Sequence, residues 1–352
     1  MNTPLDIPLD AAYTLATLEH THTIVQTVPG GDETRAFALA VPKSWGYAKT
    51  FGPVTEELFV PRGIGYFAGG LEAEDPVISV SATRVPFEVP IDHWTRALFA
   101  AEGWTALQGT WFPGPHGSMF DLTGVKVVDH IELVRRTTVR NDGISLFSVH
   151  TICGRTRWDE LKESLWVAHL TFKLTGGQGE TKMEPWLQAA ATEPNFETAY
   201  PRSWEHEVAA VRDDGISGVH MRLLDAAQET LMAYVLVRAK RTDPADKRPL
   251  GVLVESTTTM LERSEIRSVG QLRPTTEEED PRAAAIEGWV DGAIGDGMLG
   301  TAEITLRLGF LRRDDILFTL VSCSPKRDQD PWTALRATRA FEIARFALRL
   351  LP

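Results

Sequence analysis

The sequence has little cysteine, a deficit of basic side chains and no long apolar run. Its 352 residues include two cysteines, Cys153 and Cys323, and each ends an apolar, strand-like run. Free cysteine packs as a small apolar residue, so these positions predict buried thiols in a reducing compartment. We therefore expect no disulfide between them.

The charge balance is acidic. The chain has 36 Lys and Arg residues against 48 Asp and Glu residues, a formal net charge of −12. That charge repels phosphate backbones and anionic lipid headgroups. One local group of basic residues, Arg135, Arg136 and Arg140, is interpreted as the solvated side of a strand. Nucleic acid is not an expected partner.

Membrane and export signals are also missing. No stretch approaches the roughly 18 consecutive apolar residues of a membrane-spanning helix. Residues 1–30 contain acidic residues and no basic segment followed by an apolar one, which is unlike a secretory signal. We expect a cytoplasmic protein that does not insert into membranes.

The patterns that carry nucleophilic catalysis do not occur. The chain has no Gly-x-Ser-x-Gly segment, and both cysteines lie in predicted strands. The nearest hint, Pro115-His116-Gly117-Ser118, has the composition of a turn. The sequence predicts no catalytic residue and no enzyme activity.

Metal ligands are sparse. The one suggestive pair is His20-x-His22, and two ligands do not make a metal site. Other histidines, including His150, His169 and His220, are scattered along the chain. We expect them at the surface or as core residues with satisfied hydrogen bonds.

One glycine-rich segment has the letters of a dinucleotide fingerprint, Gly295-x-Gly297-x-x-Gly300. That motif binds pyrophosphate through the amides of a helix that follows it. Residues 301–311 have a strand pattern instead, so we expect the glycines to form a hairpin loop. No cofactor is predicted.

What is present is internal similarity. A chain of 352 residues favours two domains. Pro42-Lys43-Ser44-Trp45 recurs as Pro201-Arg202-Ser203-Trp204, and a hairpin with a charged turn recurs at 140–149 and 313–321. Two such matches predict tandem copies of one unit.

The tryptophans divide into two groups. Four recur at corresponding places and are interpreted as repeated core residues: Trp45, Trp204, Trp158 and Trp332. Four are less constrained and are the first candidates for contact with a partner: Trp104, Trp111, Trp186 and Trp289.

Strand and helix patterns follow the same order in both halves. They favour an α+β fold in which each copy has an antiparallel sheet with helices packed on one face. The expected boundaries are an N-terminal extension at 1–35, a first copy at 36–175, a linker at 176–196 and a second copy at 197–352. Gly and polar residues in 176–196 support the linker.

These features together resemble the PsbP-like fold. They are the Pro-x-Ser-Trp strand start, a helix in mid-domain, the hairpin, and a final helix ending in Leu170-Thr171-Phe172-Lys173-Leu174. Within that fold the sequence is most similar to bacterial DcrB-like proteins, including the Eag chaperones of type VI secretion. The resemblance implies a non-enzymatic adaptor or chaperone that shelters apolar helices of a secreted effector. A typical Eag chain has one domain and dimerises, whereas two copies are expected here.

Two other function classes remain open. An enzyme or small-ligand binder would place its pocket at the junction of the two domains. An acidic immunity-type inhibitor would use the net charge to attract a basic toxin.

Overall fold

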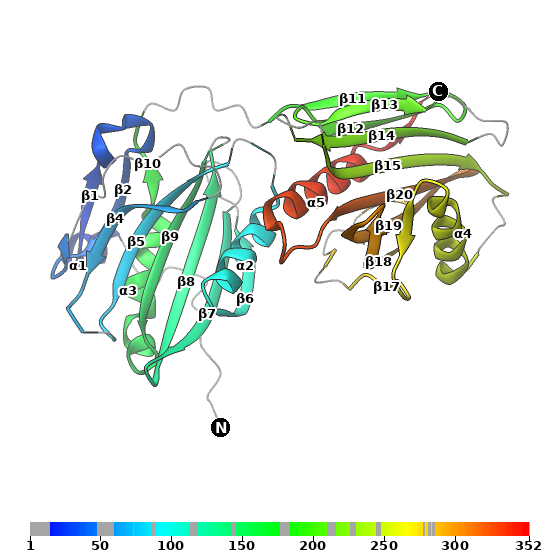
Figure 1. Cartoon of the computed structure of the whole chain (residues 1–352). Coiled ribbons are helices and arrows are strands. Elements are labelled where there is room, and N and C mark those ends of the chain that lie inside the picture. The colour runs from blue at the N-terminus through cyan, green and yellow to red at the C-terminus, as the bar shows by residue number, and fades with distance from the viewer. Residues whose placement is uncertain are drawn as a thin grey trace. The chain divides into compact units, whose positions relative to one another are not determined.

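The computed structural model describes residues 15–47, 60–72, 74–85, 87, 89–112, 119–142, 145–176, 184–209, 216–225, 230–243, 248–276, 279–280, 283 and 286–351. The chain divides into two compact units. Unit 1 contains Met1–Pro86 and Ile91–Met183, and unit 2 contains Phe87–Pro90 and Glu184–Pro352. Unit 1 is coloured from blue to green in Figure 1, and unit 2 from green to red.

The described part of unit 1 forms two antiparallel sheets and three α-helices. The helices are α1 (Leu15–Thr21), α2 (Ile91–Ala101) and α3 (Arg155–Thr171). The strands are β1 (His22–Thr27), β2 (Phe37–Pro42), β3 (Gly46–Tyr47), β4 (Arg62–Ala68), β5 (Val77–Arg84), β6 (Thr105–Phe112), β7 (Met119–Val128), β8 (Ile131–Asn141), β9 (Ser145–Gly154) and β10 (Lys173–Leu174). The small sheet has the order β1-β2-β10, and the large sheet has the order β3-β4-β5-β9-β8-β7-β6.

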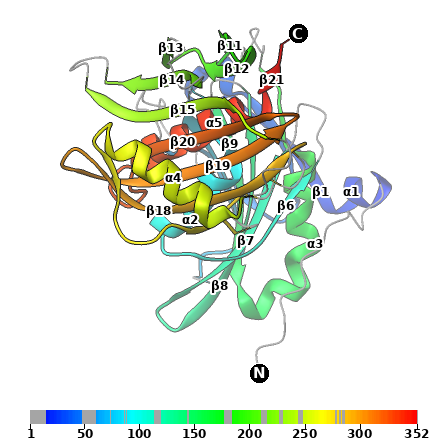
Figure 2. The same ribbon diagram turned by 90° about the vertical axis from the view of Figure 1, so that its right-hand side faces the viewer.

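Unit 2, as far as it is described, also forms two antiparallel sheets, with two α-helices. The helices are α4 (Leu250–Glu262), which runs across the large sheet (Figure 2), and α5 (Pro331–Phe346). The strands are β11 (Trp186–Ala191), β12 (Phe196–Pro201), β13 (Glu205–Ala209), β14 (Ile216–Leu224), β15 (Leu231–Arg241), β16 (Ile266–Ser268), β17 (Arg273–Pro274), β18 (Trp289–Leu299), β19 (Ala302–Arg313), β20 (Ile316–Pro325) and β21 (Arg349–Leu350). The sheet orders are β11-β12-β21 and β13-β14-β15-β20-β19-β18-β16, with β17 also paired to β18.

The two units share one strand order. Each position in the small sheet and in the large sheet of unit 1 has a counterpart in unit 2, and β17 is the addition. The central strands define the correspondence: Phe147 on β9 lies opposite Ala82, and Phe318 on β20 lies opposite Ala239. An origin by duplication stays a prediction.

Helices cover both faces of each large sheet. Neighbouring residues on a strand point to opposite faces. On β8, the Arg135 guanidinium lies over Phe99 of α2, whereas that of Arg136 lies over Trp166 of α3. The predicted α+β class with antiparallel sheets is confirmed, but the expectation of helices on one face is wrong, because the mid-domain helix and the final helix take opposite faces.

Apolar side chains on these faces form the cores. In unit 1, Phe37, Val149 and Trp158 belong to the cluster between α3, the small sheet and the large sheet, and Phe99 joins Phe120 and Leu122 on the α2 side. In unit 2 the α5 side contains Phe196, Phe318 and Phe341, and the α4 side contains Leu253, Leu306 and Val321. Burial of these faces explains why the predicted strands and helices form.

The repeated Pro-x-Ser-Trp segments form the same turn. The amide of Trp45 donates to the Pro42 carbonyl at 3.0 Å, and that of Trp204 donates to the Pro201 carbonyl at 2.9 Å. Trp158 and Trp204 are buried, whereas Trp45 and Trp332 are half-buried. The Pro115–Ser118 turn lies outside the described residues.

The two ranges expected to lie outside the copies contain paired strands. The range 1–35 includes β1, which pairs with β2, and the range 176–196 includes β11, which pairs with β12. The domain boundaries themselves stay predictions. The described residues contain no helix that is long and apolar enough to cross a membrane.

The glycine-rich segment is only partly a loop. Gly295 and Gly297 lie within β18, so the expected hairpin loop is wrong for them, and Gly300 forms the turn into β19. The predicted strand after these glycines is confirmed. A Cβ atom on Gly295 would lie 2.7 Å from Cδ2 of Leu272, so the glycine allows close approach between strand and loop.

Candidate functional site

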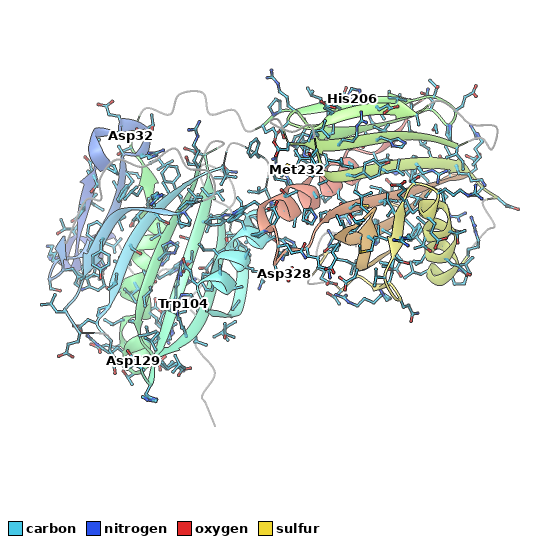
Figure 3. The ribbon with its side chains drawn as sticks, in the orientation of Figure 1. Asp32, Trp104, Asp129, His206, Met232 and Asp328 are labelled. Carbon is cyan, nitrogen blue, oxygen red and sulfur yellow. The ribbon has the colours of Figure 1, made fainter. Side chains whose placement is uncertain are left out.

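The four tryptophans proposed for partner contact lie in three different settings. Trp104 precedes β6, where it is labelled in Figure 3, and Trp111 lies near the end of that strand. Trp186 begins the edge strand β11 and is exposed, with the Arg339 guanidinium 5.4 Å from its ring. Trp289 begins β18 and packs against the α5-side core. Trp104 and Trp111 thus lie at opposite ends of β6, and the partner role of the four tryptophans stays a prediction.

β6 is the longest edge strand of the described sheets. Among described strands it pairs with β7 alone, and its eight residues, Thr105–Phe112, contain no charged side chain. Leu107 is 50% exposed and Trp111 is 38% exposed. Natural edge strands are usually short, charged or interrupted, because unpaired backbone groups invite another strand. β6 has a bulge at Leu107 but lacks the other protections.

Both faces of β6 carry aromatic rings. The Trp111 ring lies 5.2 Å from that of Phe120 on the α2 side, and the Phe112 ring lies 5.7 Å from that of Trp166 on the α3 side. A strand added beside β6 would therefore find apolar contacts on both faces. Sequence reasoning singled out Trp111 but missed the strand edge; the uncharged run Thr105–Phe112 was the available signal.

The corresponding edge of unit 2 is protected. β16 has three residues, including the exposed Arg267, and β17 has two residues and contains Pro274. The opposite edge strand, β13, carries Glu205 and Glu207. Short length, proline and charge are the usual barriers to strand addition. The two large sheets thus differ at this edge.

A buried polar network lies on the α2 side of unit 1. Arg135 forms an ion pair with Glu102, and its Nη2 lies 2.9 Å from Nδ1 of His150. Thr137 Oγ1 accepts from Arg135 Nε at 3.0 Å and also lies 3.0 Å from Nδ1 of His150. Ser81 Oγ lies 3.0 Å from Nε2 of His150. The guanidinium of Arg135 lies 4.8 Å from the ring of Phe99 on α2 and 5.5 Å from that of Trp104, the residue before β6.

The Ser81–His150 pair has the contacts of a catalytic dyad but the wrong proton arrangement. Arginine can only donate hydrogen bonds, so Nδ1 of His150 must accept from Arg135. The ring proton then lies on Nε2, which donates to Ser81 Oγ and cannot remove its proton. Burial and the charge of Arg135 lower the pKa of His150 well below its usual value, so the ring stays neutral. In this state His150 is a structural residue.

A second buried network lies on the α3 side. Arg136 Nε donates to Asp121 Oδ1 at 3.0 Å and its Nη2 donates to Oδ2 at 2.8 Å. The ring of Trp166 lies 3.4 Å from this guanidinium. His169 lies between two hydroxyls, with Thr138 Oγ1 2.9 Å from Nδ1 and Thr151 Oγ1 3.0 Å from Nε2. Burial lowers the pKa of His169 well below its usual value.

Unit 2 has its own buried ion pair on the α5 side. Arg345, which is fully buried, donates from Nη2 to Asp280 Oδ1 at 2.8 Å. Arg307 Nη2 donates to the Glu279 carbonyl at 2.7 Å. Arg307 lies opposite Ser322, as Arg136 lies opposite Thr151, so the two arginines occupy corresponding positions.

The interpretation of Arg135, Arg136 and Arg140 as a solvated face is wrong. Arg135 and Arg136 are buried, because carboxylates, hydroxyls and aromatic rings from other elements surround them. Arg140 is partly buried and donates to the Phe172 carbonyl at 3.0 Å. The signal in the sequence was Asp121, an acid within the apolar run Met119–Val128.

The two cysteines are buried, and His20 and His22 lie on different elements. The predicted burial of Cys153 and Cys323 is confirmed, and burial raises the pKa of each thiol to about 12. His20 lies in α1 and His22 in β1, where Ser164 Oγ is 3.2 Å from its Nε2. Within the described ranges there is no group of three or more His, Cys, Asp or Glu residues arranged to hold a metal ion.

The solved structures that resemble this chain include distant ones. No family model and no curated protein matches the chain. Similar solved structures are PsbP (CyanoP) of Synechocystis, with 13% identity over 47% of this chain and 99% of that chain at a TM-score of 0.34, and LpqN of Mycobacterium tuberculosis, with 14% identity over 46% and 96% at 0.31. A chain of the Tle4–Tli4 complex is 10% identical over 93% of this chain and 97% of its own, at a TM-score of 0.23. TM-scores this low carry no argument about family, partner or activity.

Proposed function

We propose that this chain is a non-enzymatic binding protein whose unit 1 holds an extended segment of a protein partner as an added strand beside β6. The observation that carries the proposal is the long, uncharged edge of β6, with exposed side chains at Leu107 and Trp111. Strand addition uses backbone hydrogen bonds for affinity and alternate side chains for specificity. The counterpart edge in unit 2 lacks the length for such pairing.

The partner segment is expected to be extended and apolar on alternate residues. One set of its side chains would pack beside Trp111 and the other beside Phe112, because those rings lie on opposite faces of β6. An uncharged segment suits this edge, since β6 offers no charged side chain to pair with a buried charge.

The geometry of the described reactive residues supports a role without catalysis. Ser81 has no base, because Nε2 of His150 holds the proton. The thiols of Cys153 and Cys323 stay protonated near neutral pH, because burial raises their pKa.

A narrower hypothesis is that the protein is a PsbP-like chaperone of the DcrB or Eag type with two copies in one chain. It would act in the cytoplasm on apolar helices of a secreted effector. Its support is the residue pattern from Pro42-Lys43-Ser44-Trp45 to the final helix of each unit. The helices on both faces of the large sheets favour an edge over an open sheet face as the site. If the protein is instead an immunity-type inhibitor that attracts a basic toxin, its binding should weaken strongly as salt is raised.

The experiment begins with capture of partners by the tagged full chain at low and high salt, followed by purification of the partner. Leu107→Lys places a charge on the β6 edge, and Val269→Lys is the matched control, since Val269 is 54% exposed in unit 2. We expect Leu107→Lys to weaken binding at least tenfold in calorimetry and Val269→Lys to leave it unchanged. Equal affinities for both variants would refute the β6 site.

Hydrogen exchange then separates a strand from a helix as the bound form. Strand addition predicts that amides of Thr105–Phe112 become protected in the complex. If the partner is protected as a helix and the exchange of the β6 amides is unchanged, strand addition is wrong and the helix-sheltering chaperone is favoured.

A further inference from the structure

A cavity of about 190 Å³ lies in unit 2, beside α4, and is lined by residues of β13, β14, β15 and β16. Its floor is formed by β14 and β15, which contribute His220, Tyr234, Leu236 and Arg238. Its wall is the end of α4 and the turn that follows, including Arg263. A dry cavity of about 150 Å³ can hold benzene, so this volume suits a small organic molecule.

The charge of the cavity is positive although the chain is acidic. Arg238 and Arg263 both line it, and none of the described lining residues is Asp or Glu. The lining is thus basic in a chain with a net charge of −12, and the neighbouring Glu207, opposite His220, pairs with Arg222 at 3.6 Å. Paired guanidinium groups are the usual protein ligands of carboxylate and phosphate oxygens.

The carbonyl end of α4 would normally repel an anion, because the helix dipole is negative there. Here the final carbonyls are already bonded. The amide of Arg263 donates to the Met260 carbonyl, that of Ser264 to the Leu261 carbonyl at 2.8 Å, and that of Glu265 to the Glu262 carbonyl. Three of the last carbonyls of α4 are thus hydrogen-bonded, which reduces their repulsion of a bound anion.

The other lining residues that matter here are three apolar side chains and the contact between Tyr234 and His220. Leu236, Leu261 and Ile266 are buried and present hydrocarbon to the cavity. Tyr234 Oη lies 2.6 Å from Nδ1 of His220, and burial raises the pKa of Tyr234, so the phenol keeps its proton. The contact fixes the imidazole of His220 against Tyr234 at the floor of the cavity.

We propose that this cavity binds a small organic monoanion with an apolar body, of the class of aromatic or branched monocarboxylates. The guanidinium groups of Arg238 and Arg263 hold the carboxylate, and the leucine and isoleucine side chains contact the hydrocarbon body. The site is independent of strand addition at β6, because its lining residues all belong to unit 2.

The test is calorimetric titration of the full chain with three probes: benzoate, its neutral isostere benzamide, and inorganic phosphate. We expect benzoate to bind at least tenfold more tightly than benzamide, because the charged hydrogen bonds are lost, and at least tenfold more tightly than phosphate, because the apolar contacts are lost. Equal affinity for benzoate and benzamide, or no binding of benzoate, would overturn the proposal.

Variants locate the site. Arg238→Met should weaken benzoate binding at least tenfold, whereas Arg267→Met removes the same charge from an exposed residue outside the cavity and should change it less than twofold. Gly218→Val fills the floor from β14 and provides a second variant if Arg238→Met does not fold. Equal effects of Arg238→Met and Arg267→Met, or unchanged binding in Gly218→Val, would also overturn it.

Discussion

At the central strands, β8 and β9 in unit 1 and β19 and β20 in unit 2, the sheet face beneath the mid-domain helix is polar in unit 1 and apolar in unit 2. Arg135 and Thr137 on β8 correspond in register to Leu306 and Leu308 on β19, and His150 corresponds to Val321. Unit 1 fills this face with hydrogen bonds to His150, and unit 2 fills it with a hydrocarbon cluster. One strand order therefore supports two kinds of interior, provided that every buried polar group finds a partner.

The opposite faces are more alike. Arg136 and Arg307 occupy corresponding positions, and each unit buries an ion pair there, Arg136 with Asp121 and Arg345 with Asp280. The source of the carboxylate differs, since Asp121 lies on β7 and Asp280 lies in the segment before β18. A buried arginine on the final-helix side is thus shared, while its partner is not.

The largest expected effect is the loss of one of these carboxylates. Asp121→Asn leaves Arg136 charged and buried, and Asp280→Asn does the same to Arg345. Removing one partner of a buried pair costs about 3–5 kcal/mol, so the free energy of unfolding of the affected unit should fall by that amount. Unit-resolved hydrogen exchange in urea measures it. Asp159→Asn is the control, because Asp159 pairs with Lys162 at the surface and is 70% exposed; a similar loss there would contradict the prediction.

Placing a residue from the polar face of unit 1 at the corresponding position of the apolar face of unit 2, or the reverse, should lower the free energy of unfolding by less. Leu308→Thr removes buried hydrocarbon and adds an unpartnered hydroxyl, at an expected cost of about 2–4 kcal/mol. Thr137→Leu removes the bonds to Arg135 and His150 and overfills the site, at about 1–3 kcal/mol. Chemical denaturation of each variant gives these values. Neutral exchange in both directions would mean that the two interiors are interchangeable.

Acid should weaken unit 1 through its neutral histidines. The pKa values of His150 and His169 are lowered in the fold, so below about pH 6.5 the unfolded chain binds more protons and stability falls as pH falls. The loss is about 1.4 kcal/mol per pH unit for each histidine. The position in unit 2 that corresponds to His169 is Arg345, since each lies four residues before the last strand of its unit, β10 or β21. Arginine does not titrate in this range, so this position adds no such pH dependence to unit 2.

The variant that isolates this effect is His169→Gln, whose amide can still bond Thr138 and Thr151. It should remove about 1.4 kcal/mol per pH unit from the dependence of unit 1 between pH 6.5 and 5. The slope of the parent chain alone is less informative, because burial raises the pKa of Asp121, which acts in the opposite direction. An unchanged slope in urea unfolding at several pH values would show that His169 is protonated in the fold.

The smallest expected effect on stability is at the β6 edge. Leu107→Lys changes an exposed residue and should alter the free energy of unfolding by no more than about 0.5 kcal/mol. Thermal unfolding of Leu107→Lys and Val269→Lys checks this and separates loss of binding from loss of fold. A large drop for Leu107→Lys would show that the edge is part of the core.

Local patterns in the sequence were enough to predict some elements of the fold, but not β1 and β11. The strand predicted after Gly300, the burial of Cys153 and Cys323 and the α+β class follow from apolar periodicity and turn residues, which act over a few neighbours along the chain. Tertiary structure alone decided that Arg135 and Arg136 are buried, that helices cover both faces, and that β6 is an edge while β8 is central. The physical reason is that charge pairing and edge position depend on strand register between distant residues, such as Asp121 beside Arg136, and no local pattern contains that register.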